Sequence, residues 1–236
     1  MRDGLLIINK PKGMTSHDVV QIARRKLGVQ RIGHTGTLDP MAEGVLVLLV
    51  GRATKTQREA QTHRKRYDVI ITFGTQTDTG DAWGQPVKTA AVPVLDRQRV
   101  DAVLASFVGR LTQVPPAFSA AKVRGRPLYW WARRGERPSA PAKTVEIFSV
   151  ELLACGGVQL RCRVECSAGT YIRNLAEAVA ERLGTVGHVS ELTRTAVGAW
   201  DLSQAIAVGQ LQDAAAPDAW AFVRPMEMFH AGAHRT

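Results

Sequence analysis

The sequence predicts an α+β fold in which a mixed, largely antiparallel central sheet is flanked by helices. Residues 67–73 place apolar side chains at every second position, which is typical of a half-buried strand. Residues 144–154 and 158–166 resemble two strands joined by a Gly-Gly turn, which predicts an antiparallel pair. No internal repeat and no linker between two cores is visible, so we expect a single domain over residues 1–236.

The first quarter of the chain alternates short strands and helices. Residues 5–8 form a strand-like apolar run. Residues 15–18 have the pattern of a capping box, which predicts a helix that continues to about Leu27. Residues 45–50 are aliphatic and rich in valine, as in a buried strand, and residues 54–62 favour a short helix.

The remaining segments predict further helices and one insertion. Apolar residues recur at helical spacing in residues 96–111. Residues 112–142 are rich in proline and basic side chains, so we interpret them as an excursion from the core that is at least partly mobile. Residues 170–183 predict an amphipathic helix, with Arg173 outside its apolar stripe. Residues 200–236 are alanine-rich and predict one more helix in an extension packed on the core.

A net charge of +10 and a pI near 10.1 favour a polyanionic partner. The basic side chains gather in residues 52–66 and 122–137, and the second cluster contains Tyr129, Trp130 and Trp131. A basic stretch is often only a solvated surface, but aromatic side chains among basic ones suit a strand whose bases can stack. We therefore favour RNA as the partner.

Several classes of protein are disfavoured. The longest aliphatic run, residues 45–50, is too short to span a bilayer, and the N-terminus lacks the pattern of a signal peptide, so we expect a cytoplasmic protein. The chain has three cysteines, Cys155, Cys162 and Cys166, and an odd number argues against a disulfide framework. Cys162 and Cys166 would lie about 13 Å apart along a strand, which is too far for both to bind one zinc ion. We expect no metal ion and no cofactor.

The loop of residues 33–44 contains one carboxylate, Asp39, apart from the glutamate near its end. Gly36 gives the backbone freedom to approach a ligand, and Pro40 stiffens the turn. His34 is the only other titratable side chain before Glu43. An aspartate before a proline most often just starts a turn, so the loop alone leaves both a turn and a nucleophile open.

Five segments in this order resemble the bacterial tRNA pseudouridine synthase B family, which isomerises the uridine of the TΨC loop. They are Lys10 to Ser16, Gly33 to Gly44, Lys65 to Tyr67, Gln113 to Gly135 and Cys166 to Arg173. Each segment alone would be a weak signal, whereas five in order are specific. The resemblance covers nearly the whole chain and implies a pseudouridine synthase fold with residues 112–142 as a thumb-like RNA-binding insertion.

The resemblance also implies the roles of individual residues. The catalytic aspartate falls on Asp39, the active-site tyrosine on Tyr67, and the arginine that pairs with the nucleophile on Arg173. The positions expected to bind substrate are His34, Tyr171, Leu192, Lys10, Gly36, Lys65, Lys122 and Arg133. A carboxylate suits this reaction because it can both attack and leave, and an arginine beside it would keep it ionised. The implied partner is the T stem-loop of tRNA, modified at position 55 by base flipping, and we expect a monomer.

The chain departs from the family pattern in three places. Ala168 stands where the family often has lysine, and Phe118 where it often has tyrosine, so an RNA contact could be lost at each. The sequence ends at Thr236, which leaves no room for the small C-terminal RNA-binding (PUA) domain of many members. The alternative is a non-catalytic RNA-binding or RNA-folding module that uses the same basic surface, and a metal-dependent nuclease is a weaker rival.

Overall fold

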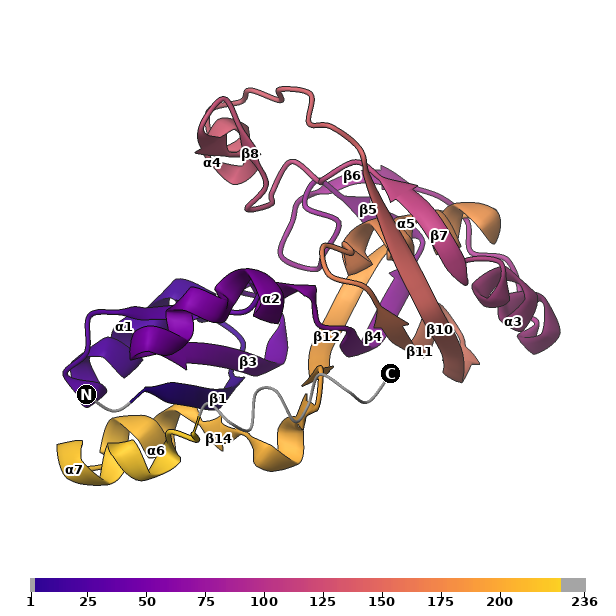
Figure 1. Ribbon diagram of the computed structural model, residues 1–236. Helices are drawn as coiled ribbons and strands as arrows, with labels where there is room; N and C mark the ends of the chain where they lie inside the picture. Colours follow the sequence, from indigo (N-terminus) through magenta and orange to yellow (C-terminus); the bar gives the residue numbers. More distant parts are fainter. Residues whose placement is uncertain (1–2, 226–236) are drawn as a thin grey trace. The chain divides into compact units, whose positions relative to one another are not determined.

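The computed structural model describes residues 3–225, which form two compact units (Figure 1). Unit 1 combines residues 1–67 with residues 193–236, and unit 2 contains residues 68–192. Each unit contains strands of a mixed, largely antiparallel sheet covered by helices, which confirms the predicted fold class. The expectation of a single domain stays a prediction. Residues 226–236 of the expected C-terminal extension lie outside the described residues.

In unit 1 the strand order is β14-β1-β3-β12, with β2 beside β3 and β13 beside β12. The strands are β1 (Gly4–Lys10), β2 (Ile32–His34), β3 (Glu43–Val50), β12 (Gly187–Val197), β13 (Trp200–Asp201) and β14 (Ile206–Ala207). Strands β1 and β3 pair antiparallel along their whole length, while β12 is parallel to β3 at Thr193 and Arg194. The predicted strands at residues 5–8 and 45–50 are confirmed, whereas β12 was not predicted.

Both faces of the β1 and β3 pair are buried, which explains their continuous aliphatic sequences. Leu6, Ile8 and Leu48 point to one side, where helices from both ends of the chain cover them. These helices are α1 (Ser16–Leu27), α6 (Val208–Asp213), α7 (Ala216–Ala219) and η3 (Trp220–Phe222). Figure 1 shows α1 lying across the strands. Leu5 and Ile7 point to the other side, toward η1 (Gly51–Thr56), α2 (Gln57–Thr62) and η2 (Leu202–Gln204).

The predicted helix start at residues 15–18 is confirmed. Thr15 caps α1, its side chain accepts from the backbone N–H of Asp18, and the Asp18 carboxylate accepts from the Thr15 N–H. Gly28 ends the helix in the left-handed conformation, with φ of 65°.

In unit 2 the strand order is β12-β4-β11-β10-β7, and strands β4 and β12 also run into unit 1. The strands are β4 (Lys65–Phe73), β7 (Gly109–Gln113), β10 (Lys143–Gly156) and β11 (Gln159–Cys166). The alternation predicted in residues 67–73 is observed, because Tyr67, Val69, Ile71 and Phe73 are buried. Strands β10 and β11 form the predicted antiparallel pair.

Two helices of unit 2 differ from the prediction. Helix α3 (Arg97–Ala105) is shorter than the predicted 96–111, because residues 109–113 pair with β10 as strand β7. Gly109 has φ of 112°, a conformation that a helix cannot contain. Helix α5 (Ile172–Arg182) buries Arg173, which the sequence pattern places outside the apolar stripe. The sequence pattern did not indicate this burial, which is possible because polar acceptors from other segments bind its guanidinium.

The remaining elements are short. A hairpin is formed by β5 (Thr75–Thr77) and β6 (Pro86–Thr89). The segment 112–142, which leaves β7 and returns at β10, carries β8 (Lys122–Val123), β9 (Arg126–Pro127) and α4 (Leu128–Ala132). Figure 1 labels β8 and α4 on it. Across residues 3–225, every helix is too short or too polar to cross a bilayer.

Strands β3 and β12 approach so closely at Gly44 that a side chain cannot fit between them. A Cβ at Gly44 would lie 2.2 Å from the Arg194 carbonyl oxygen, and the residue has φ of 111°. We expect Gly44→Ala to lower the free energy of unfolding by about 3 kcal/mol or more, from strain and steric overlap together. Urea denaturation would measure this cost.

Gly28→Ala is the matched control, because Gly28 also has positive φ but nothing lies within 4 Å of the point that an added Cβ would occupy. It should cost only about 1–2 kcal/mol, from backbone conformation alone. Equal losses in the two variants would contradict the close approach of β3 and β12.

Candidate active site

The Asp39 loop lies in unit 1, between β2 and β3, and its backbone is held on both sides of the aspartate. The Ser16 hydroxyl accepts from the Leu38 N–H at 2.8 Å and donates to the Leu38 carbonyl at 3.0 Å. The Gly13 N–H donates to the Pro40 carbonyl at 2.9 Å. Both contacts come from the segment that ends β1 and begins α1, so this segment fixes the position of Asp39.

The loop is also held from β12 by Arg194, which the sequence did not reveal. Its side chain is fully buried and donates to the backbone carbonyls of Gly36, Thr37 and Val45. A basic residue facing inward breaks the apolar alternation that marks a strand, which is why β12 and Arg194 were missed.

Lys10 is a second buried cation in this unit. Its ammonium donates to the carbonyls of Pro11 at 2.9 Å and Met14 at 2.8 Å. Burial, and then the charge of Arg194, lowers the pKa of Lys10 to about 8, although the carboxylates of Asp39 and Glu43 act in the opposite direction. Lys10 therefore lies within the electrostatic influence of Asp39.

The other predicted residues of unit 1 lie close to this loop or on β4. The His34 Nδ1 accepts from the Gly36 N–H at 3.3 Å, and burial lowers the pKa of His34, so its ring is largely neutral at pH 7. Lys65 is buried, and its ammonium donates to the carbonyls at the end of α2. A Cβ at Gly36 would lie 3.9 Å from the Lys65 Cε. Tyr67 is buried, with 8% of its surface exposed.

Arg173, the predicted counter-charge, belongs to unit 2 and is 4% exposed. Its guanidinium donates to the Thr79 carbonyl at 2.6 Å and to the Phe118 carbonyl at 2.8 Å. Asp81, another residue that the sequence did not reveal, lies 3.7 Å from Arg173 Nη1. Because Phe118 contributes its backbone, this bond does not need the tyrosine hydroxyl that the family often has there.

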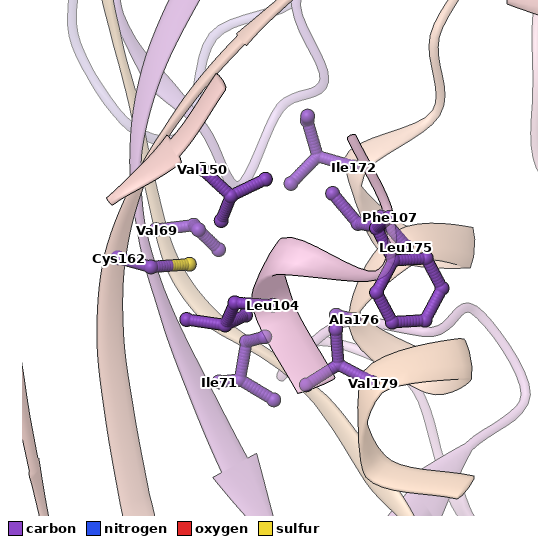
Figure 2. A pocket seen from close by; sticks show the side chains of 10 residues that line it. All are labelled: Val69, Ile71, Leu104, Phe107, Val150, Cys162, Ile172, Leu175, Ala176 and Val179. Atoms are coloured by element: carbon purple, nitrogen blue, oxygen red, sulfur yellow. The ribbon is translucent and has the colours of Figure 1, made fainter. Parts of the chain in front are cut away.

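Apolar packing and a side-chain amide fix the start of α5, and therefore Arg173. Ile172 and Leu175 on α5 face Val69 of β4 and Leu104 of α3 across a small apolar pocket (Figure 2). The Gln113 amide accepts from the Tyr171 N–H at 2.9 Å and donates to the Tyr171 carbonyl at 3.2 Å. The start of α5 is thus held by apolar packing of the helix and by the bonds of Gln113 to the N-cap residue, Tyr171.

The remaining predicted residues of unit 2 differ in exposure. Leu192 is buried on β12. Lys122 and Arg133 are exposed on the insertion. Arg133 lies over the ring of Tyr129, at 5.5 Å from its centroid, and Arg134 lies over Trp130 at 3.6 Å. The insertion therefore presents paired basic and aromatic side chains, as the sequence suggested.

Unit 1 thus carries Lys10, His34, Gly36, Asp39, Lys65 and Tyr67, and unit 2 carries Tyr171, Arg173, Leu192, Lys122 and Arg133. The pairing of Asp39 with Arg173 stays a prediction. Within residues 3–225, no three His, Cys, Asp or Glu side chains are grouped so that they could hold a metal ion, and the cysteines form no disulfide.

Comparison with known proteins decides the family. The profile described as "TruB family pseudouridylate synthase (N terminal domain)" matches residues 24–172, and that of the "tRNA pseudouridylate synthase B C-terminal domain" matches residues 173–229. The chain belongs to the TruB family of pseudouridylate synthases. The predicted family is confirmed, and with it the prediction of an enzyme of the pseudouridine synthase class.

Relatives of the TruB family match most of the chain. It is 44% identical over 210 residues to the tRNA pseudouridine synthase B of Aromatoleum aromaticum, covering 89% of this chain and 68% of the relative. The Caldanaerobacter subterraneus protein of the same name is 41% identical over 228 residues, covering 96% of this chain and 78% of the relative.

Solved structures show the same fold. A Cbf5-Nop10-Gar1 complex contains a chain with a TM-score of 0.72 and 28% identity, which covers 95% of this chain. An H/ACA RNP bound to a substrate RNA containing 2′-deoxyuridine gives a TM-score of 0.66 and 26% identity, and covers 89% of this chain. This chain spans 60% and 52% of those two chains, respectively.

The buried Lys10 of this TruB family member should titrate at an unusually low pH. We expect one lysine signal in an NMR titration of labelled protein to have a pKa of about 8, and Lys10→Arg to remove that signal. A titration in which no lysine signal has a pKa near 8 would contradict the burial of Lys10 and the influence of the Arg194 charge on it.

The same shift has a consequence for stability. The pKa of Lys10 is lower in the folded protein than its usual value of 10.5, so the unfolded chain binds this proton more tightly. The contribution of Lys10 to the free energy of unfolding therefore increases as pH rises from about 8 to 10.5.

Proposed function

We propose that this protein isomerises uridine to pseudouridine at position 55 in the T loop of tRNA, with Asp39 as the nucleophile. The observation that carries the proposal is the Asp39 loop, whose backbone is hydrogen-bonded on both sides of the aspartate. Membership of the TruB family supports the reaction class, and the names of the relatives, tRNA pseudouridine synthase B, support tRNA as the substrate.

The reaction exchanges one bond to the sugar for another. The bond from C1′ to N1 of uracil breaks, the ring turns, and a bond from C1′ to C5 forms. The proton on C5 leaves, and N1 takes up a proton. A carboxylate serves if it attacks C1′ or adds to C6 of the ring, because it is both a nucleophile and a leaving group, and it serves as the base that takes the C2′ proton if a glycal forms. The reaction consumes no co-reactant and needs neither a metal ion nor a cofactor.

Arg173 is proposed as the cation that pairs with Asp39 and keeps its carboxylate ionised. Its bonds to the Thr79 and Phe118 carbonyls, together with Asp81, restrict the guanidinium before substrate binds. Such preorganisation lowers the cost of reorienting charged groups during the reaction. Tyr67 would stack on the uracil ring.

Base flipping requires compensation, because unstacking a nucleotide costs a few kcal/mol. His34 would fill the space that the uridine leaves, and its lowered pKa favours the neutral ring. We propose that Tyr171 and Leu192 contact the flipped nucleotide. Gly36 would provide clearance for it.

The basic residues would bind the RNA backbone. Lys122 and Arg133 are exposed on the insertion and suited to phosphate contacts, and the nearby aromatic rings to stacking. Lys10 and Lys65 are buried and donate to backbone carbonyls, so we propose that they support the RNA site by holding its backbone. We further propose that the protein acts as a monomer in the cytoplasm on the T stem-loop of tRNA.

Replacing Asp39 by asparagine tests the nucleophile. Asp39→Asn keeps the size of the side chain but removes the charge, so we expect the single-turnover rate to fall by a factor of about 10³ or more, with RNA binding retained. Asp213→Asn, an exposed aspartate at the end of α6, should react like the unchanged protein. Conversion of tRNA by Asp39→Asn at a rate near that of the unchanged protein would rule out the mechanism.

Mapping the product tests the substrate. We expect an isolated T stem-loop transcript to acquire pseudouridine at position 55, because the proposed contacts lie within that arm. A transcript with cytidine at position 55 should acquire none. Unchanged uridine after prolonged incubation would instead favour the non-catalytic RNA-binding module, and pseudouridine at another position would overturn the assigned site.

A further inference from the structure

Arg194 is the largest side chain that is fully buried in the described part of the molecule, and its location is unusual for a cation. It lies on β12 with 1% of its surface exposed. Among residues 3–225, no carboxylate lies within ion-pair distance of its guanidinium. All three of its hydrogen bonds go to backbone carbonyls.

The three carbonyls lie on the two segments that flank Asp39, here called the arms of its loop: residues 36–37 before it, and Val45 at the start of β3 after it. Nη2 donates to Gly36 at 3.1 Å and Nη1 to Thr37 at 3.2 Å, on the arm that leaves β2. Nε donates to Val45 at 2.7 Å, on the arm that enters β3. The planar guanidinium therefore joins the residues before Asp39 to those after it. A lysine ammonium is a single point donor and cannot reproduce this fork.

A purely structural role does not explain the charge. A buried cation without a carboxylate partner lowers stability, and a buried apolar side chain would be the better structural choice. The carbonyl dipoles compensate part of that cost, and only because the loop is folded around the arginine. The interaction therefore couples the shape of the loop to the presence of a positive charge.

The charge also acts on the side chains of the loop. Arg194 contributes to the lowered pKa of both Lys10 and His34, so its electrostatic influence extends over this site. A potential that disfavours protonation of these groups favours a negative charge on a carboxylate in the same place.

We propose that Arg194 is a positioning residue of the reaction, which joins the two arms of the Asp39 loop and thereby holds the nucleophile in its reactive orientation. The inference rests on the proposed role of Asp39. Because Arg194 is buried, it acts through the loop without touching the RNA.

Single-turnover kinetics at saturating protein separate this role from RNA binding. We expect Arg194→Met to lower the rate constant by a factor of about 10² when corrected for the folded fraction, because small displacements of a reacting group have effects of this size. The RNA dissociation constant, which is measured separately from the chemical step, should stay within about threefold of the original. The reason is that Arg194 is buried and does not touch the RNA. Arg194→Lys keeps the charge and should recover part of the lost rate.

Arg224→Met is the matched control. Arg224 also belongs to unit 1 and donates to a backbone carbonyl, that of Gln204, at 3.1 Å. It makes no hydrogen bond to the Asp39 loop among the described contacts. Its replacement should leave the rate constant of the folded protein unchanged.

A folded Arg194→Met protein with the original rate constant would overturn the inference, as would a loss that lies wholly in RNA binding. If Arg194→Met does not fold, Arg194→Lys provides the test. A rate constant of Arg194→Lys equal to that of the original protein would show that the guanidinium geometry is not needed, and would overturn the inference. Asp39→Asn is measured in parallel. An active Asp39→Asn would refute the proposed function, whereas an inactive Asp39→Asn beside a fully active Arg194 variant would refute only this inference.

Discussion

The structure of unit 1 depends on how one short loop is held. Residues 35–42 have little regular structure of their own, so their conformation must come from partners elsewhere in the chain. Those partners come from Gly13 and Ser16, at the start of α1, and from Arg194 on β12, which is far away in sequence. The loop therefore has its observed shape only when the start of α1 and strand β12 are both in place beside it.

This constraint explains features that otherwise look unrelated. In the segment Lys10 to Ser16, the Lys10 ammonium donates to a carbonyl of the same segment. The Gly13 N–H and the Ser16 hydroxyl donate to carbonyls of the Asp39 loop. Gly44 has no side chain because β12 passes too closely to allow one. In unit 2, carbonyls, Asp81 and the Gln113 amide similarly restrict Arg173 and the start of its helix. Each unit thus arranges its proposed reactive group before any substrate is present, which is the condition for electrostatic preorganisation.

The sequence predicted the elements whose signals are local. The capping box at Thr15 and Asp18 and the alternation of residues 67–73 depend on neighbouring residues, and both are observed. The family was also predictable, because five motifs keep their order. Arg194 and Asp81 could not be predicted, because their importance comes from long-range partners: Gly36 and Val45 for one and Arg173 for the other. For the same reason, the pairing of β7 with β10 was not visible in the pattern of residues 96–111.

The central claim is that a preorganised Asp39 acts directly on a uridine flipped out of the T loop. A crystal structure of the protein with a T stem-loop RNA carrying 5-fluorouridine at position 55 tests it most directly. We predict that the modified nucleotide lies outside the RNA stack, with its sugar or ring in contact with the Asp39 carboxylate, and that the bonds from Ser16 and Arg194 to the loop are unchanged. A nucleotide that remained stacked in the RNA, or one bound away from Asp39, would contradict the account.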